Sequence, residues 1–203
     1  KDHKFIVQEQ LSALNLETQA ILMEPFGRNT APAVAMTAMK LVNEGCDELM
    51  LVLPADHVID DQKALQRALA LATVAAERGE MVLFGVPATK PETGYGYIRS
   101  SQDALLPEGV ARVAQFVEKP DEKRATEFVR AGGYFWNSGM FLFRASRFLE
   151  ELKKHDPDIY DTCLLALERS DQQGDTLSID EATFACCPGN SIDYAVMEKT
   201  QAA

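Results

Sequence analysis

A carboxylate of the kind that holds a divalent metal stands directly after a buried-type strand. Residues 49–53 form a continuous apolar run that ends at Pro54, and Asp56 follows two residues later. Ligands of open α/β sheets bind at this end of the strands, and Mg²⁺ prefers one or two carboxylates together with phosphate oxygens and water. Asp56 is therefore a candidate Mg²⁺ ligand, and a turn or helix-cap role explains the same residue.

A carboxylate and a cation follow the predicted strand at residues 113–117. Lys119 is a compact point charge that suits a phosphate group, and Glu118 precedes it. Neighbouring strand side chains point to opposite faces, so both face one ligand only if the strand ends before them. Pro120 cannot donate to a ladder and favours such an end. A solvated ion pair before a helix is the alternative interpretation.

A basic, polar segment opens the helix predicted at residues 31–44. Arg28, Asn29 and Thr30 precede it, and Pro32 lies in its first turn. The free N–H groups at a helix start and the Arg28 guanidinium suit a phosphate or polar base edges. Capping explains Asn29 or Thr30 equally well. Capping does not explain Arg28 beside a glycine, which favours a binding role.

Three further places offer polar contacts. Gly94 lies in a strand-like stretch with a second glycine, where a ligand can approach the backbone closely. Asn137 and Ser138 precede a predicted strand and suit sugar hydroxyls, although ordinary turns fit these places too. Asp193 lies in the first turn of a short helix, where it serves either as a second metal carboxylate or to offset the helix dipole.

Alternating strands and helices must position these side chains. We expect an open α/β sheet with helices on both faces, formed by one domain over residues 1–203. The apolar runs predict strands at residues 20–23, 49–53, 81–86, 94–98, 113–117 and 140–143. The amphipathic segments predict helices at residues 5–14, 31–44, from about 61, 122–130, 146–154, 159–169 and 193–199.

Composition narrows the function classes. The 203 residues are 46% hydrophobic and carry a formal net charge of −11, which argues against nucleic acid and anionic membranes as partners. A small anionic ligand then needs local cations or a bound metal. No apolar stretch approaches the roughly 20 residues of a membrane span, and the start does not resemble a signal peptide. We expect a cytoplasmic protein whose four cysteines are reduced.

Taken in order, six short strings resemble the sugar-1-phosphate nucleotidyltransferases, and specifically the bacterial mannose-1-phosphate guanylyltransferases. Each string is short, but all six occur in register and together cover nearly the whole chain. The strings are residues 27–33, 53–57, 92–98, 117–120, 136–141 and 191–199.

The resemblance implies a Rossmann-like, mixed but mainly parallel sheet flanked by helices, and a Mg²⁺-assisted reaction of GTP with mannose 1-phosphate. The products are GDP-mannose, used for polysaccharide biosynthesis, and pyrophosphate. By position, the resemblance implies that Asp56 and Asp193 hold Mg²⁺ and that Lys119 neutralises the sugar phosphate. It implies that the sugar is contacted by Gly94, Glu118, Asn137 and Ser138. It also implies that the nucleotide is lined by Arg28, Asn29 and Thr30. The sugar phosphate would attack the α-phosphorus in line, with Lys119 and Asp56 as the catalytic residues.

One family feature has no match in this sequence. Members begin with a strand and a glycine-rich loop that grips the triphosphate, and no such loop occurs here. We therefore expect a sheet without its first strand and little or no turnover by this chain alone. Two alternatives stay open: a non-catalytic sugar-nucleotide-binding or regulatory domain, and an enzyme for another sugar 1-phosphate and nucleotide. The sequence also leaves open a homodimer.

Overall fold

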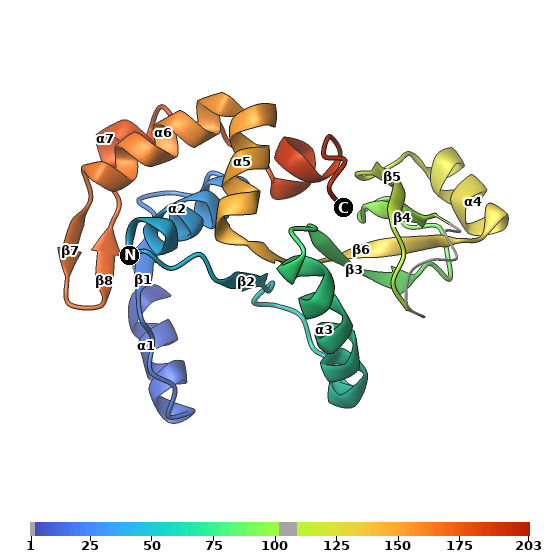
Figure 1. The fold of residues 1–203 in the computed structure, drawn as a ribbon, viewed down its shortest axis with the longest axis horizontal. Coiled ribbons are helices and arrows are strands. Elements are labelled where there is room, and N and C mark those ends of the chain that lie inside the picture. The colour runs from blue at the N-terminus through green and yellow to red at the C-terminus, as the bar shows by residue number, and fades with distance from the viewer. Residues whose placement is uncertain (1–2, 102–108) are drawn as a thin grey trace.

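A computed structural model describes residues 3–101 and 109–203 (Figure 1). Its main sheet is built around one long strand, β6 (Tyr134–Arg144). Along one edge of β6 lie β2 (Leu49–Val52) and β4 (Tyr97–Ser100), and β5 (Val113–Val117) extends the sheet beyond β4. Along the other edge lies β3 (Val82–Pro87), which pairs with β6 at many of the same residues.

The strand directions in this sheet differ from the expected parallel pairing. β2, β3 and β4 all pair with β6 in the antiparallel sense, so these three strands point the same way without neighbouring one another. The reason is that β6 runs opposite to all three, with β3 along one edge and β2 and β4 along the other, and supplies their hydrogen bonds. The α/β class and the helices that flank the sheet are as predicted.

A second, three-stranded sheet lies at the other end of the molecule (Figure 1). β1 (Ile21–Met23) pairs in parallel with β8 (Thr176–Ser178), and β8 forms an antiparallel hairpin with β7 (Asp171–Gln173). The hairpin turn contains Gly174 at a φ of 62°, a left-handed conformation that glycine adopts at little cost. The strands β7 and β8 were not predicted, because they are polar and only three residues long.

The helices cover both faces of the main sheet, as the alternation along β6 requires. Phe141 and Phe143 point into the large core formed with helices α2 (Thr30–Asn43) and α5 (Ala145–His155). Leu142, between them, packs on the opposite face against Ala72 and Ala76 of helix α3 (Gln62–Glu77). The remaining helices are α1 (His3–Ala13), α4 (Glu122–Ala131), α6 (Pro157–Glu168), α7 (Glu181–Phe184) and the π-helical turn η1 (Asp193–Met197).

Two helices lie at the edges of this arrangement. α4 covers the outer end of the sheet, where Phe128 stacks on Tyr134 at a ring-centroid distance of 4.3 Å. α1 extends away from the body in Figure 1 and leaves Phe5 largely exposed. Within the described residues, no helix is both long and apolar enough to cross a membrane.

Candidate functional site

An irregularity in β6 places the first group of polar side chains. Ordinary turns were the alternative interpretation for residues 136–139, but the structure continues one strand through them. Leu83 of β3 pairs with Phe141 and Gly85 pairs with Asn137, so β6 contains two extra residues there. Gly139 takes a φ of 71° within this bulge. Bulges re-aim side chains and are common next to active sites.

The side chains of the bulge satisfy its backbone. Oδ1 of Asn137 accepts the N–H of Gly139, and Oγ of Ser138 accepts the N–H of Met140, each at 3.2 Å. The N–H of Asn137 donates to the carbonyl of Gly96 over 2.7 Å. These contacts fix the direction of the Asn137 amide and give Ser138 a structural role in the bulge.

The Asn137 amide meets Asp193. Its Nδ2 donates to Oδ1 of Asp193 over 2.7 Å, which joins β6 to η1. Burial raises the pKa of the Asp193 carboxyl above its ordinary value, and the hydrogen bond from Asn137 opposes that effect. A half-buried carboxylate with an oriented neighbour is suited to hold a cation, and its place in the first turn of η1 also fits the helix-dipole role.

The turn after β5 brings Glu118 and Lys119 to the same place. β5 ends at Val117, and Lys119 takes a left-handed φ of 43°, so the two side chains no longer alternate across a strand. Nζ of Lys119 lies 3.4 Å from Oε1 of Glu118. The Glu118 side chain is only 7% exposed, against 56% for Lys119, so this is not a pair of solvated charges.

Glu118 carries an unsatisfied oxygen. Its Oε2 is buried and has no hydrogen-bond partner among the described residues. Burial, and then the nearby charge of Asp193, raise the pKa of the Glu118 carboxyl. A buried acceptor without a partner is costly, and a ligand hydroxyl would satisfy it.

Gly96, and not the predicted Gly94, lies against these groups. A Cβ built on Gly96 would lie 2.5 Å from Oε2 of Glu118 and 3.3 Å from Cβ of Asn137. A Cβ built on Gly94 would meet nothing within 4 Å, and Gly94 is exposed. Sequence reasoning noted both glycines of this motif, but the alternation of a strand puts them on one face and does not separate them.

The predicted nucleotide residues dock the start of α2 onto the chain that leads to Asp193. Asn29 is the N-cap, and its Oδ1 accepts the N–H of Thr30. Oγ1 of Thr30 accepts the N–H of Ile192 over 3.0 Å. Nη2 of Arg28 donates to the carbonyl of Ala185 over 2.6 Å. The capping interpretation is therefore confirmed for Asn29, and Arg28 and Thr30 have structural contacts beside their predicted role.

Asp56 stands apart from the other predicted site residues. Its side chain is 89% exposed on the loop after β2, with Oδ1 at 3.8 Å from Nε2 of His57. Among the described residues it makes no hydrogen bond to Asn137 or Asp193. The loop does run beside the bulge, because Cγ of Pro54 lies 3.4 Å from a Cβ built on Gly139. Its metal role stays a prediction.

The site suits a metal cation whose coordination shell is completed mainly by substrate phosphate oxygens and water. No cluster of three or more histidine, cysteine, aspartate or glutamate side chains suited to a metal occurs among the described residues. Mg²⁺ does not require one, because one or two carboxylates suffice when phosphate oxygens and water complete its shell. Asp193, Glu118 and Glu198 place three carboxylates near the cation of Lys119, which leaves an excess of negative charge for a metal to offset.

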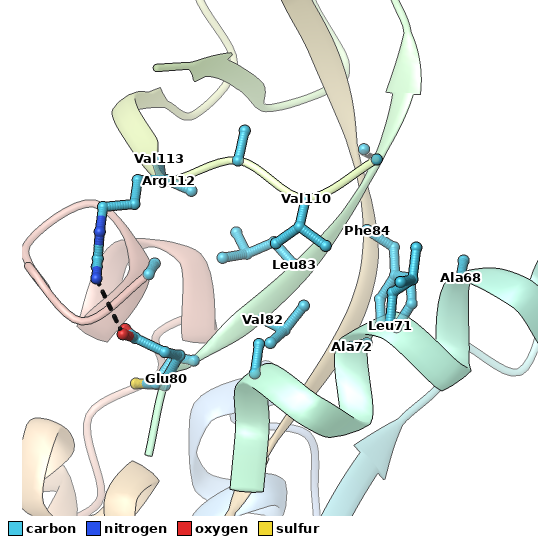
Figure 2. A pocket seen from close by; sticks show the side chains of 16 residues that line it. Ala68, Leu71, Ala72, Glu80, Val82, Leu83, Phe84, Val110, Arg112 and Val113 are labelled. Atoms are coloured by element: carbon cyan, nitrogen blue, oxygen red, sulfur yellow. Dashed lines mark hydrogen bonds and ion pairs between the residues drawn. The ribbon is translucent and has the colours of Figure 1, made fainter. Parts of the chain in front are cut away.

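An apolar cavity of about 230 Å³ lies elsewhere, between α3, β3 and residues 110–113 (Figure 2). Leu71, Val82 and Val110 line it, and at its rim Arg112 pairs with Glu80 over 3.2 Å. None of the predicted site residues lines this cavity. The polar site described above lies at the β6 bulge, the turn after β5 and η1, and it is distinct from this cavity.

The chain is similar to several known proteins. It is 93% identical over 203 residues to "Alginate biosynthesis protein AlgA" of Pseudomonas putida, and covers 42% of that protein. It is 50% identical over 204 residues to "Mannose-1-phosphate guanylyltransferase" of Escherichia coli, with 98% of this chain and 43% of that protein covered. The chain thus spans about two fifths of the length of these curated relatives.

Solved structures agree with this similarity. The crystal structure of mannose-6-phosphate isomerase from Helicobacter pylori superposes with a TM-score of 0.89 at 35% identity, and the match covers 100% of this chain and 78% of that one. Residues 1–182 match the family described as "Nucleotidyl transferase". The chain therefore belongs to the nucleotidyl transferase family.

Proposed function

We propose that the protein transfers GMP from GTP to mannose 1-phosphate, forming GDP-mannose and pyrophosphate. Membership of the nucleotidyl transferase family supports the reaction class, and the name of the Escherichia coli relative supports the sugar and the base. One observation carries the assignment to this site: Glu118, Lys119, Asn137 and Asp193 converge from three separate elements.

The side chains of this site would align the sugar phosphate. Lys119 is exposed and would pair with the phosphate as a point charge. The unsatisfied Oε2 of Glu118 would accept a hydrogen bond from a sugar hydroxyl. Asn137 lies, like this oxygen, against Gly96. The attacking phosphate oxygen is already an anion at neutral pH, so the site requires no general base. Its contribution is alignment and charge neutralisation.

Asp193, together with Asp56, would hold Mg²⁺. When bound, the metal would neutralise negative charge on the phosphates where the polypeptide, with its net charge of −11, offers few cations. Asn137 would hold the Asp193 carboxylate in a fixed direction through their hydrogen bond. A hydrogen bond of this kind orients a metal ligand in the same way as the outer-shell partners of other metal sites.

Arg28, Asn29 and Thr30 would border the nucleotide. Their contacts with residues 185–192 join the start of α2 to the segment that carries Asp193. We place the reaction in the cytoplasm, where GTP is available. The alginate and xanthan biosynthesis proteins among its relatives support a role in making polysaccharide precursors.

The test is pyrophosphate release with GTP, mannose 1-phosphate and Mg²⁺ by the intact protein, meaning a protein that carries this chain at the full length of its curated relatives. We expect turnover that needs all three components and falls at least tenfold when UTP or glucose 1-phosphate replaces the matching substrate. Asp161→Asn, at an exposed position on α6, is the control variant and should retain full activity. Binding of GDP-mannose without turnover would instead support a non-catalytic domain, and preference for another pair would change the substrates.

A further inference from the structure

We infer that Glu198 is a positioning residue that holds Lys119 and Asp193 in a fixed relation. Its side-chain Oε1 accepts the N–H of Glu118 over 2.7 Å, directly before Lys119. Its own N–H donates to the carbonyl of Asp193 over 2.9 Å. One residue therefore ties the turn that carries the lysine to the helical turn that carries the aspartate. This inference rests on the proposed function of the site.

The turn at Lys119 is a place where such an anchor matters. The φ of 43° at Lys119 is a left-handed conformation that L residues other than asparagine and aspartate rarely adopt. The turn leaves β5 at Val117 and enters α4 at Asp121, whose Oδ1 accepts the N–H of Arg124. Between these two fixed points, the bond from Glu118 to Glu198 ties the turn to a distant part of the chain.

The anchoring needs an acceptor oxygen and not a negative charge. Glu198 is exposed, so its charge is solvated, while its contact with Glu118 is a single N–H donated to a single oxygen. Glutamine retains an oxygen of the same reach, and alanine does not. Glu198→Gln should therefore preserve the anchor that Glu198→Ala removes.

The structural step is tested by hydrogen exchange at the amide of Glu118 in the intact protein. We expect exchange to be at least tenfold faster in Glu198→Ala than in the unsubstituted protein, with Glu198→Gln close to the latter. Glu127→Ala, at an exposed glutamate on α4, is the matched control and should change nothing. Equal exchange in Glu198→Ala would overturn the inference, and this measurement does not depend on turnover.

The functional step is tested by kinetics. In Glu198→Ala we expect the KM for mannose 1-phosphate to rise about tenfold to a hundredfold, because a small misplacement of a positioned group can cost that much, with the KM for GTP nearly unchanged. Glu198→Gln should restore the KM. In a Lys119→Gly background, Glu198→Ala should raise the KM for mannose 1-phosphate by less than about twofold, because there is no lysine left to position.

These outcomes separate the two proposals. Absence of turnover in the unsubstituted intact protein would contradict the proposed function, and the amide exchange would still decide the anchor. Normal turnover with an unchanged KM in Glu198→Ala, or an equal loss in both KM values that glutamine does not restore, would contradict the positioning role alone.

Discussion

Nδ2 of Asn137 lies 2.7 Å from Oδ1 of Asp193 and donates a hydrogen bond to it, joining residues 56 positions apart in the chain. The bond depends on the bulge in β6, which turns the asparagine toward η1. It also depends on Gly96, whose carbonyl accepts the Asn137 N–H. Strand β6 and the turn η1 thus meet through one oriented amide.

Replacement of Asn137 by alanine should lower kcat/KM about tenfold to a hundredfold. The substitution removes the donor that orients Asp193, and residues with this role typically show losses of that size. Steady-state kinetics with both substrates would measure the effect, with Asp161→Asn as the control. A loss of less than twofold would show that Asp193 does not depend on the amide.

Replacement of Asp193 by asparagine should abolish metal-dependent activity and raise metal-free stability. Burial raises the folded-state pKa above 3.8, so between 3.8 and that raised value the folded protein binds more protons than the unfolded chain. Stability then falls as pH rises through this window, and the full penalty is present above it. At pH 7 in EDTA we expect Tm to rise about 2–4 °C, the shift that ~1 kcal/mol produces in a domain of this size.

Magnesium provides the second half of that test. A metal that binds the folded state alone raises its stability, so Mg²⁺ should raise the Tm of the unsubstituted protein and leave Asp193→Asn unchanged. Thermal unfolding with and without Mg²⁺ measures both. An equal Mg²⁺ response in the two proteins would remove Asp193 from the metal site.

Replacement of Gly96 by alanine should damage the site more than the same change at Gly94. The new Cβ would lie 2.5 Å from Oε2 of Glu118 and 3.2 Å from Cζ of Phe116, so the carboxylate must move. We expect at least a tenfold rise in the KM for mannose 1-phosphate. A Cβ at position 94 would lie in open space, so Gly94→Ala should raise this KM less than Gly96→Ala does. The reverse order would favour Gly94, and not Gly96, as the glycine that contacts the sugar.

Many of the strands and helices could be predicted from the sequence, because they depend on local patterns of residues. The apolar run at residues 49–53, the helix start at Asn29 and the strand end before Pro120 all produce the expected elements. The β6 bulge could not be predicted in this way. Its glycine and polar residues are typical of a turn, and only the pairing of Gly85 with Asn137 shows that the strand continues.

In the candidate site too, some residues could be predicted from the sequence and others could not. The types of Lys119, Glu118 and Asp193 indicated phosphate and metal chemistry before any fold was known. The importance of Gly96 and Glu198 depends on contacts between distant segments, which no spacing in the sequence reveals. The short polar strands β7 and β8 were missed for a related reason, since β8 pairs with the distant strand β1 and β7 pairs only with β8.

Replacement of Lys119 by glycine should weaken use of mannose 1-phosphate specifically. Glycine accepts the φ of 43° without strain, so this change removes the charge and leaves the turn intact. We expect the KM for mannose 1-phosphate to rise at least tenfold and the Tm to change little. Lys123→Ala, at an exposed lysine on α4, is the control. Unchanged kinetic constants in Lys119→Gly would refute the phosphate role.

Calorimetric titration of the protein with GDP-mannose, with and without Mg²⁺, tests directly whether Lys119, Glu118, Asn137 and Asp193 form one sugar-phosphate and metal site. We predict one site per chain that binds at least tenfold more tightly with Mg²⁺, and loss of that gain in Asp193→Asn. Lys119→Gly should weaken binding under both conditions. An affinity for GDP-mannose that is the same with and without Mg²⁺, and that neither substitution changes, would contradict the assignment of this site.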